Sequence, residues 1–290
     1  MQQVIEKAAV LIEALPYIQR FRGETVVVKF GGSIMEDEAA VANILKDIAF
    51  MACVGLRPVI VHGGGKAISH ELKQRGLRAS FVQGLRVTDI DTIEVVESVL
   101  NHRVNPQLVT VLQSFGCKAR GIHGDDIFRV RRRTQKDKAT GKTLDWGYVG
   151  EVQEVDAAPV EAFLQAAITP VVTPLGRDAG RQIYNVNADD AAAALARALR
   201  ARKLVFLSDV PGVLADPRDK ESRISTVKVA EVNALIKRGV IDGGMLPKIQ
   251  GAVDALHAGV LKTHIIDAGL PHSLLLELFT DRGVGTEIIK

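Results

Sequence analysis

The chain has 290 residues, of which 47% are hydrophobic and 24% are charged, and its formal net charge at pH 7 is +3. These values are typical of a soluble globular protein with one large α/β domain or two lobes, and the small net charge favours no class of partner. No run approaches the roughly 18 apolar residues of a membrane helix, and the first residues lack the features of a signal peptide. We therefore expect a cytoplasmic protein that does not enter a membrane.

The two cysteines indicate the redox compartment, and one local run of basic residues raises the question of a nucleic-acid partner. Cys53 and Cys117 stand far apart in apolar stretches, where we expect them to pack as small hydrophobic side chains in a reducing compartment. The basic run consists of Arg129, Arg131, Arg132, Arg133, Lys136 and Lys138. No aromatic side chains are interleaved with it, so a solvated face is favoured over a nucleic-acid patch.

The first predicted element is an amphipathic helix over residues 2–15. Its apolar face consists of Val4, Ile5, Ala8, Leu11, Ile12 and Leu15. Pro16 and Gly23 separate this helix from the rest of the chain. Two interpretations stay open, because the face can pack on the protein's own body or dock against another subunit.

Two buried strands that end in glycines follow. Residues 25–30 are apolar apart from Thr25 and Lys29 and run into Gly31 and Gly32, and residues 58–62 run into three glycines at 63–65. Helices are predicted at 37–54 and 66–75, so the order βαβα implies parallel strands and right-handed crossovers. Glycine turns beside a lysine suit a phosphate, because backbone N–H groups can approach an anion without a Cβ in the way. Ordinary tight turns between strand and helix are the alternative.

The alternation of strands and helices continues to the end of the chain. A loop at 80–88 carries Arg86, and Thr88 or Asp89 can cap a helix towards Ser114 that bends near Pro106. Further strands are predicted at 118–122, 127–133, 168–173, 203–207, 262–266 and 283–289. Residues 134–152 are predicted to form a hairpin-rich excursion, and helices are predicted at 156–166, 185–199, 228–238 and 243–259. No low-complexity linker interrupts the chain, which favours two lobes on one continuous sheet.

Four motifs in a fixed order carry a resemblance to a known family. They are Lys29-Phe30-Gly31-Gly32-Ser33, His62-Gly63-Gly64-Gly65, Asn185-Val186-Asn187-Ala188-Asp189 and Gly243-Gly244-Met245-Leu246-Pro247-Lys248. Together they resemble the amino acid kinase family. With Gly84-Leu85-Arg86-Val87-Thr88 they are similar to its acetylglutamate kinases, from about residue 24 to the C-terminus.

The resemblance implies a fold and a division of the chain. The fold is a three-layer αβα sandwich around a mainly parallel central sheet. The implied parts are an N-terminal helix for oligomerisation and regulation (1–22), an N-lobe for acetylglutamate binding and dimerisation (23–175) and a C-lobe for ATP binding (176–290).

The implied reaction transfers the γ-phosphoryl group of ATP to the side-chain carboxylate of N-acetyl-L-glutamate, in arginine biosynthesis. A carboxylate is already ionised at pH 7, so no general base is needed and charge neutralisation is the main demand. By resemblance, Lys29 stabilises the transition state on the acceptor side and Lys248 on the leaving side, with Asp189 between them. Asp189 would at the same time be an acid in the first turn of its helix.

Further residues have roles implied by the same resemblance. Arg86 would clamp the substrate α-carboxylate as a bidentate fork, and the remaining substrate-binding residues would be Gly64, Gly65, Asn185 and Asn187. ATP, with Mg²⁺ bound to it, would be held by Gly31, Gly32, Asp209, Val210, Pro211, Gly212, Val213 and Leu214. No spacing of His, Cys, Asp or Glu suggests a metal site made by the protein alone.

Regulation is a further implication. The segment before residue 23 resembles the N-terminal helix of arginine-inhibited members, in which such helices join dimers into a hexameric ring. The run 271–286 also resembles those members, and the residues that match their arginine site are Tyr17, His264, Glu277 and Gly283. Alternatively, Leu274, Leu275, Leu276 and Leu278 are core and Glu277 is solvated. The resemblance also suggests a nitrogen-signalling protein as a partner.

Two other functions stay open at this point. One is another carboxylate kinase of the family, acting on a carrier-linked aminoadipate, a carbamate or aspartate. The other is a non-catalytic sensor on the same fold, although a sensor has no need for both Lys29 and Lys248.

Overall fold

The structure is a computed structural model that describes residues 1–136, 141, 143–280 and 283–290, with the backbone alone at residues 3, 4 and 7. Lys138 of the basic run, part of the predicted excursion at 134–152 and residues 281–282 of the C-terminal run lie outside the described residues. The position of the Val4 side chain on the predicted helix face also lies outside them.

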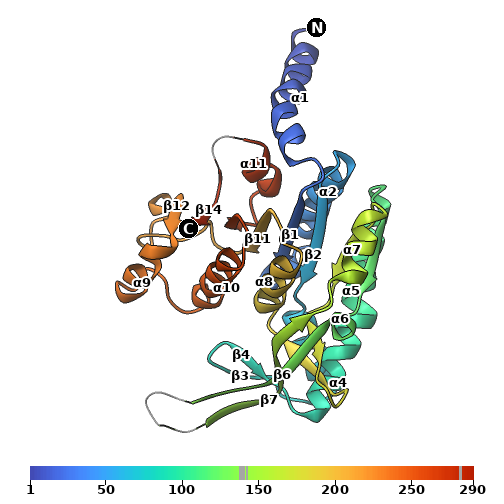
Figure 1. Ribbon diagram of the computed structural model, residues 1–290, viewed down its shortest axis with the longest axis vertical. Helices are drawn as coiled ribbons and strands as arrows, with labels where there is room; N and C mark the ends of the chain where they lie inside the picture. Colours follow the sequence, from blue (N-terminus) through green and yellow to red (C-terminus); the bar gives the residue numbers. More distant parts are fainter. Residues whose placement is uncertain (137–140, 142, 281–282) are drawn as a thin grey trace.

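A large sheet of eight strands forms the centre of the molecule (Figure 1). Its strands, in spatial order, are β12 (Thr226–Lys228), β14 (Thr286–Ile289), β13 (Lys262–Asp267), β11 (Lys203–Ser208), β1 (Thr25–Phe30), β2 (Arg57–His62), β8 (Thr169–Val172) and β5 (Ala119–Ile122). Within this sheet only the pair β13–β14 is antiparallel. Strands from both predicted lobes therefore belong to one sheet, because β1 pairs with β2 on one side and with β11 on the other.

Helices cover both faces of this sheet. In β1, Val26 and Val28 pack into one core cluster and Val27 packs into the other, as the alternation of side chains along a strand requires. The first cluster takes in α2 (Glu38–Cys53), α3 (Gly65–Gln74), α4 (Ile90–Val99), α5 (Asn105–Ser114) and α11 (Ser273–Phe279). The second takes in α7 (Ala158–Gln165), α8 (Ala188–Ala198), α9 (Val229–Lys237) and α10 (Met245–His257). The predicted three-layer αβα fold is confirmed.

A second, smaller sheet was not foreseen. Residues 127–152 were expected to form one exposed strand and a hairpin-rich excursion. Instead a closed barrel is formed by β10 (Ile183–Val186), β7 (Thr143–Val155), β6 (Phe128–Lys136) and β9 (Leu175–Arg177). Two of its strands have only three or four residues, which is too short for a periodic pattern to reveal. A short helix, α6 (Gly124–Ile127), precedes it.

The prediction of a loop at 80–88 is wrong, because residues 80–87 form a β-hairpin. Strands β3 (Ser80–Val82) and β4 (Leu85–Val87) pair antiparallel. The two residues between them, Gln83 and Gly84, both have positive φ, at 49° and 78°. A two-residue turn with this geometry matches the twist of the strands, but glutamine is an unusual residue for it and hid the signal.

The N-terminal helix is longer than predicted, since α1 runs over Gln2–Phe21 with Pro16 inside it. Proline removes one helical hydrogen bond, but Tyr17, Ile18 and Phe21 beyond it pack against the core, which offsets that loss. The first part of the helix projects from the body (Figure 1), and Ile5, Leu11, Ile12 and Leu15 are exposed. Among the described side chains of α1, packing on the main core cluster is seen at Tyr17, Ile18 and Phe21.

The long helix after Asp89 is confirmed with one change. Asp89 is its N-cap, and Asp89 Oδ1 accepts a hydrogen bond of 2.8 Å from the N–H of Thr92. The bend predicted near Pro106 is a π-helical turn, Leu100–Val104, between α4 and α5. Such turns are rare and often lie at functional sites. Two 3₁₀ turns, Gly32–Glu36 and Lys220–Ser222, complete the helical segments in the described part of the chain.

Three smaller expectations have mixed outcomes. Cys117 is buried as expected, but Cys53, the last residue of α2, is exposed. Arg131, Arg132 and Arg133 of the basic run form ion pairs, with Glu151, Asp145 and Asp190 in that order. The run 274–278 was not foreseen as a helix; in α11, Leu274 and Leu278 are buried while Leu276 is exposed.

Candidate active site

Two lysines from distant parts of the chain meet at one carboxylate. Lys29 is near the end of β1, and its Nζ lies 2.7 Å from Asp189 Oδ1. Lys248 is in the first turn of α10, and its Nζ lies 2.8 Å from Asp189 Oδ2. Asp189 is in the first turn of α8, where the helix end favours an acidic side chain. The structure thus brings together the three residues that the sequence predicts as catalytic.

The charges of this group are set by burial and by one another. Burial alone would raise the pKa of Asp189, but the two lysines outweigh it and hold that pKa below its ordinary value. Burial lowers the pKa of Lys29, and the neighbouring charge of Lys248 adds to this effect while Asp189 opposes it. Two lysines thus share one carboxylate at this site.

The two glycine turns touch each other next to Lys29. A Cβ on Gly31 would lie 2.9 Å from the Cα of Gly63, and the N–H of Gly63 donates a 2.8 Å hydrogen bond to the carbonyl oxygen of Phe30. Gly32 has a φ of +72°, which glycine adopts without strain. A Cβ on Gly64 would lie 2.5 Å from a methyl group of Leu100. Only glycine fits at this contact, so the backbone itself forms the surface beside Lys29.

Arg86 is buried on the β3–β4 hairpin, with 6% of its surface exposed. Its Nη2 donates to the carbonyl oxygen of Gly65 and to Ser69 Oγ, both at 2.8 Å. Its guanidinium lies over the ring of Phe81, 4.7 Å from the centroid. Its Nη1 is buried without a hydrogen-bond partner in the described part of the protein. Such a donor is costly unless a ligand supplies an acceptor, and a carboxylate supplies one.

The two predicted asparagines have different surroundings. Asn185, on β10, reaches the hairpin side: its Nδ2 lies 3.5 Å from the hydroxyl oxygen of Thr88. Asn187 is the N-cap of α8, and its Oδ1 accepts hydrogen bonds from the N–H groups of Asp189 and Asp190. Asn187 thus holds the helix turn that presents Asp189, while Asn185 contacts Thr88, two residues after Arg86.

The predicted nucleotide loop, 209–214, follows β11 and meets the first glycine turn. Ser33 Oγ donates a 3.2 Å hydrogen bond to Asp209 Oδ2. Gly212, with a φ of +136°, backs onto Thr286, and a Cβ there would lie 2.4 Å from the threonine Oγ1. Val213 is buried in the core, so its side chain shapes the loop from within. Val210, Pro211 and Leu214 are partly exposed and face outward more freely.

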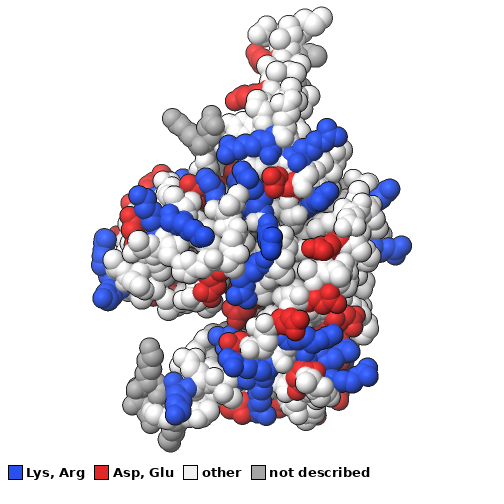
Figure 2. All heavy atoms as spheres, viewed as in Figure 1, with Lys and Arg blue, Asp and Glu red and all other residues white. Residues whose placement is uncertain are grey.

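The surface is hollowed between the part that holds α9 and α10 and the part that holds the β3–β4 hairpin (Figure 2). The helix α10, which carries Lys248, lies on one side of this hollow, and the β3–β4 hairpin, which carries Arg86, lies on the other. No group of three or more His, Cys, Asp or Glu side chains that could hold a metal ion is found among the described residues. In the same part of the chain, no helix has the length and apolar character that crossing a bilayer requires.

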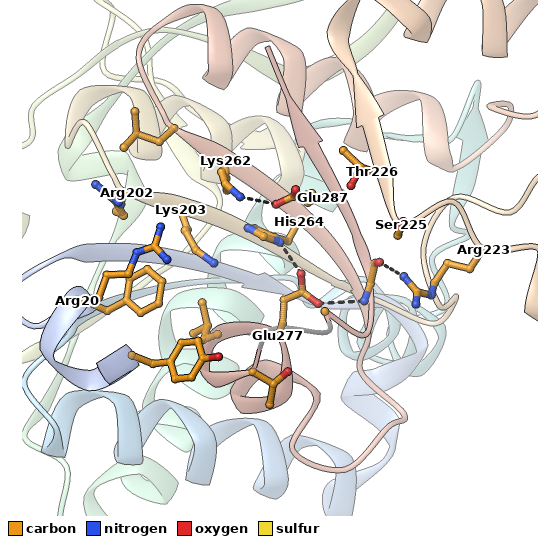
Figure 3. A pocket seen from close by; sticks show the side chains of 17 residues that line it. Arg20, Arg202, Lys203, Arg223, Ser225, Thr226, Lys262, His264, Glu277 and Glu287 are labelled. Atoms are coloured by element: carbon orange, nitrogen blue, oxygen red, sulfur yellow. Dashed lines mark hydrogen bonds and ion pairs between the residues drawn. The ribbon is translucent and has the colours of Figure 1, made fainter. Parts of the chain in front are cut away.

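A separate cavity of about 630 Å³ contains all four residues predicted for an arginine site (Figure 3). His264 Nδ1 lies 2.6 Å from Glu277 Oε1, and the N–H groups of Val284 and Gly285 donate to Glu277 Oε2. Glu277 is therefore buried and bonded, and the solvated alternative is wrong. A Cβ on Gly283 would lie 2.9 Å from both carboxylate oxygens, so glycine is needed there.

Some residues at these sites could not be recognised from the sequence. Ser69, which contacts Arg86, stands one helical turn after Gly65, but a serine on a helix carries no special signal. In the cavity, basic side chains are numerous: Arg20, Arg202, Lys203, Arg223 and Lys262. Burial lowers the pKa of Lys203 to about 8. Lys203 is the first residue of an apolar strand, and a lysine in that position usually marks the solvent-exposed end of the strand. The sequence therefore gives no sign that Lys203 lines a cavity.

Comparisons with known proteins identify the relatives of this chain. Residues 24–267 match the amino acid kinase family. Acetylglutamate kinase of Heliobacterium modesticaldum is 46% identical, with all of both chains covered, and that of Akkermansia muciniphila is 47% identical, with 99% of this chain and 97% of the relative covered.

A solved structure is similar over nearly the whole chain. N-acetylglutamate synthase from Neisseria gonorrhoeae, complexed with coenzyme A and N-acetyl-glutamate, superposes with a TM-score of 0.84 at 27% identity. This chain is covered over 98% of its length and spans 63% of the synthase. The same synthase complexed with coenzyme A and L-arginine gives a TM-score of 0.81 at 26% identity, with 98% and 65% covered. Because the family model matches most of the chain and its full-length relatives are acetylglutamate kinases, the chain belongs to the amino acid kinase family and is a kinase.

Proposed function

We propose that the protein transfers the γ-phosphoryl group of ATP to the side-chain carboxylate of N-acetyl-L-glutamate, forming N-acetyl-L-glutamyl 5-phosphate in arginine biosynthesis. The observation that carries the proposal is the meeting of Lys29 and Lys248 at Asp189, beside two bare glycine turns. The full-length relatives named acetylglutamate kinase support the choice of substrate.

The chemistry asks for positive charge and position. Both reactants are anions at pH 7, and phosphoryl transfer is catalysed mainly by positioning and electrostatic stabilisation. Lys29 would neutralise charge on the acceptor side and Lys248 on the leaving side, while Asp189 keeps the two ammonium groups from separating. Since the acceptor carboxylate is its own nucleophile, no side chain has to remove a proton.

The residues present fit ATP. Backbone N–H groups of Gly31, Gly32, Gly64 and Gly65 would hold phosphate oxygens, and the Asp209–Leu214 loop would hold the rest of the nucleotide. ATP supplies the phosphoryl group, with Mg²⁺ carried on its phosphates. The chain itself would orient those phosphates through backbone N–H groups. Glycines leave these groups accessible, and at the Gly31–Gly63 contact there is no room for a side chain.

Arg86 would bind the α-carboxylate of the acceptor through its free Nη1. We expect Arg86→Ala to raise KM for N-acetyl-L-glutamate by about tenfold to a hundredfold, because a charged hydrogen bond of roughly 1.5–3 kcal/mol is lost. KM for ATP and kcat should change much less. Steady-state kinetics checks this, with Arg86→Lys expected to behave like alanine because lysine lacks the planar fork. The exposed Arg78→Ala is the control, and an unchanged KM in the Arg86 variants would remove this residue from the binding site.

One assay tests the function as a whole. The purified chain is given ATP with N-acetyl-L-glutamate, aspartate, carbamate or an aminoadipate derivative, and the acyl phosphate is trapped as a hydroxamate. We expect turnover with N-acetyl-L-glutamate. Turnover with another acceptor instead would favour a different carboxylate kinase, and nucleotide binding without turnover would favour a sensor.

Arginine is proposed as an inhibitor that binds the cavity of Figure 3. A carboxylate offers about four acceptor positions; three of those of Glu277 are taken, and the one left can meet a guanidinium. Tyr17 would cover the effector, and the basic side chains around the cavity suit its α-carboxylate. The gonococcal synthase has been solved with L-arginine, which supports an arginine site on a related fold.

The exposed apolar face of α1 is proposed to join dimers into a hexamer. We expect deletion of residues 1–13 to lower the sedimentation coefficient to that of a dimer while kcat stays near the intact value, because that segment touches neither lysine. Deletion of residues 1–22 should also weaken arginine inhibition, since it removes Tyr17, Arg20 and Phe21 from the cavity. An unchanged sedimentation coefficient in both variants would contradict this role. A nitrogen-signalling partner stays a prediction of the resemblance alone.

A further inference from the structure

One buried histidine beside the glycine turns is not used by the proposed chemistry. His62 is the last residue of β2, directly before Gly63, and it is fully buried. Its ring nitrogens both have partners: Nδ1 lies 2.8 Å from the carbonyl oxygen of Gly63, and Nε2 lies 3.1 Å from Nδ2 of Asn105. The ring thus connects the core to the backbone of the second glycine turn.

The neighbours of this histidine determine which nitrogen carries the proton. Asn105 Nδ2 lies 2.8 Å from the carbonyl oxygen of Val171, which can only accept a hydrogen bond. The asparagine atom that faces it must be the amide nitrogen, whose second hydrogen then points at His62. Nε2 of the ring is therefore the acceptor and Nδ1 carries the hydrogen that it donates to Gly63. This tautomer follows because the carbonyl oxygen of Val171, at the end of the row Gly63–His62–Asn105–Val171, can only accept a hydrogen bond.

A peptide plane is oriented as a result. The carbonyl of Gly63 and the N–H of Gly64 belong to the same trans peptide, in which they point in opposite directions. Holding the carbonyl at the His62 ring turns the Gly64 N–H away from that ring. This N–H donates to no protein acceptor in the described part of the chain.

We infer that His62 is a positioning residue, whose ring orients the Gly63–Gly64 peptide so that the Gly64 N–H faces the phosphoryl group under transfer. In naming that group, the inference depends on the proposed function. A donor already aimed at developing charge costs no reorganisation during the reaction, and such donors are worth roughly 10²–10³ in rate.

The surrounding structure is built around this row of groups. A Cβ on Gly121 would lie 2.1 Å from Asn105 Oδ1, so β5 leaves space for the asparagine by having no side chain there. Asn105 itself is the first residue of α5, directly after the π-helical turn, and it is 2% exposed. Burial lowers the pKa of His62 to about 4, so the ring stays neutral at the pH where the enzyme works.

Two substitutions separate orientation from space filling. Asparagine at position 62 places an amide N–H near the place of Nδ1, whereas glutamine places its amide near the place of Nε2 and loses the donor to Gly63. We expect His62→Gln to lower kcat about tenfold to a hundredfold, with KM for N-acetyl-L-glutamate within about threefold. His62→Asn should keep kcat within about fivefold, although it leaves Asn105 without its acceptor. Equal losses in both variants, or no loss in His62→Gln, would overturn the inference.

The tautomer can be measured in the intact protein, even if both variants fold poorly. Nitrogen NMR of enzyme labelled with ¹³C,¹⁵N-histidine reports which ring nitrogen is protonated. His62 is identified through the coupling of its backbone nitrogen to the ¹³C-labelled carbonyl of Val61, since no other histidine follows a valine. We expect the proton on Nδ1, with no change between about pH 8 and about pH 5, since a buried neutral ring resists protonation. A proton on Nε2 would refute the row of hydrogen bonds. This measurement needs no substrate, so its failure is distinct from a failure of the kinase assay.

Discussion

Replacement of Lys248 by alanine is expected to lower kcat by about 10²–10³-fold, and Lys29→Ala is expected to do the same. Both ammonium groups act where charge develops, so the transition state should lose more stabilisation than the bound substrates. The KM values for ATP and N-acetyl-L-glutamate should therefore change by only a few fold. A coupled assay of ADP release, with the acceptor varied at saturating ATP and then the reverse, measures both parameters.

Controls for this experiment lie in the same region. Lys237→Ala removes an exposed lysine from α9 and should leave kcat unchanged. Lys248→Arg keeps the charge but changes its shape, and we expect an intermediate loss because the ammonium is a compact point charge that guanidinium does not replace. Wild-type-like kcat in Lys248→Ala would exclude this residue from the mechanism, and the proposal would then rest on Lys29 alone.

The second large effect concerns Asp189. We expect Asp189→Asn to lower the free energy of unfolding by about 3–5 kcal/mol near pH 7, because two buried ammonium groups then face each other without a counter-charge. The loss should shrink near pH 10, since Lys29, whose pKa is already lowered by burial, can give up its proton. Urea unfolding followed by circular dichroism at the two pH values measures both changes.

The neighbouring acid is the matched control. Asp190 pairs with Arg133 at 2.7 Å, and burial raises the pKa of this carboxyl, so its charge is costly to keep. Asp190→Asn should therefore cost much less stability than Asp189→Asn. Equal losses in the two variants, or a loss at position 189 that does not depend on pH, would show that helix capping and not charge pairing explains the effect.

The wild-type protein has a matching acid dependence. Because the folded-state pKa of Asp189 lies below the ordinary value of 3.8, its ionised form is favoured by folding. The stability that it contributes is fully present above about pH 3.8 and is lost as the pH falls through the lower, folded-state value. The contribution of Asp189 to the free energy of unfolding should thus be constant near neutral pH.

Most of the large sheet was predictable because its strands are short runs of apolar residues, but the three-residue strand β12, which has a single apolar residue, was not predicted. The strands at 25–30, 58–62 and 203–207 are found within one residue of their predicted bounds. The barrel was not predictable, because β9 and β10 are short and their pairing partners are brought near only by the tertiary fold. The hairpin at Gln83 and the helix through Pro16 were missed because packing overrides local preference.

The site was predictable in its parts but not in its geometry. Lys29 and its glycines can be noticed from the sequence, since a lysine inside an apolar strand needs a reason. Nothing local connects it with Lys248, which only the family resemblance singled out. The contributions of His62 and Asn105 depend on one row of hydrogen bonds across three segments, and no spacing in the sequence reveals such a row.

The place of β1 in the sheet has a consequence for how such a kinase can be divided. Since this strand is hydrogen-bonded to β2 of the first half and to β11 of the second, it is the shared seam of both. An exchange of halves between relatives would cut through that seam and displace Lys29 with it. Any such exchange would therefore have to preserve both pairings of β1.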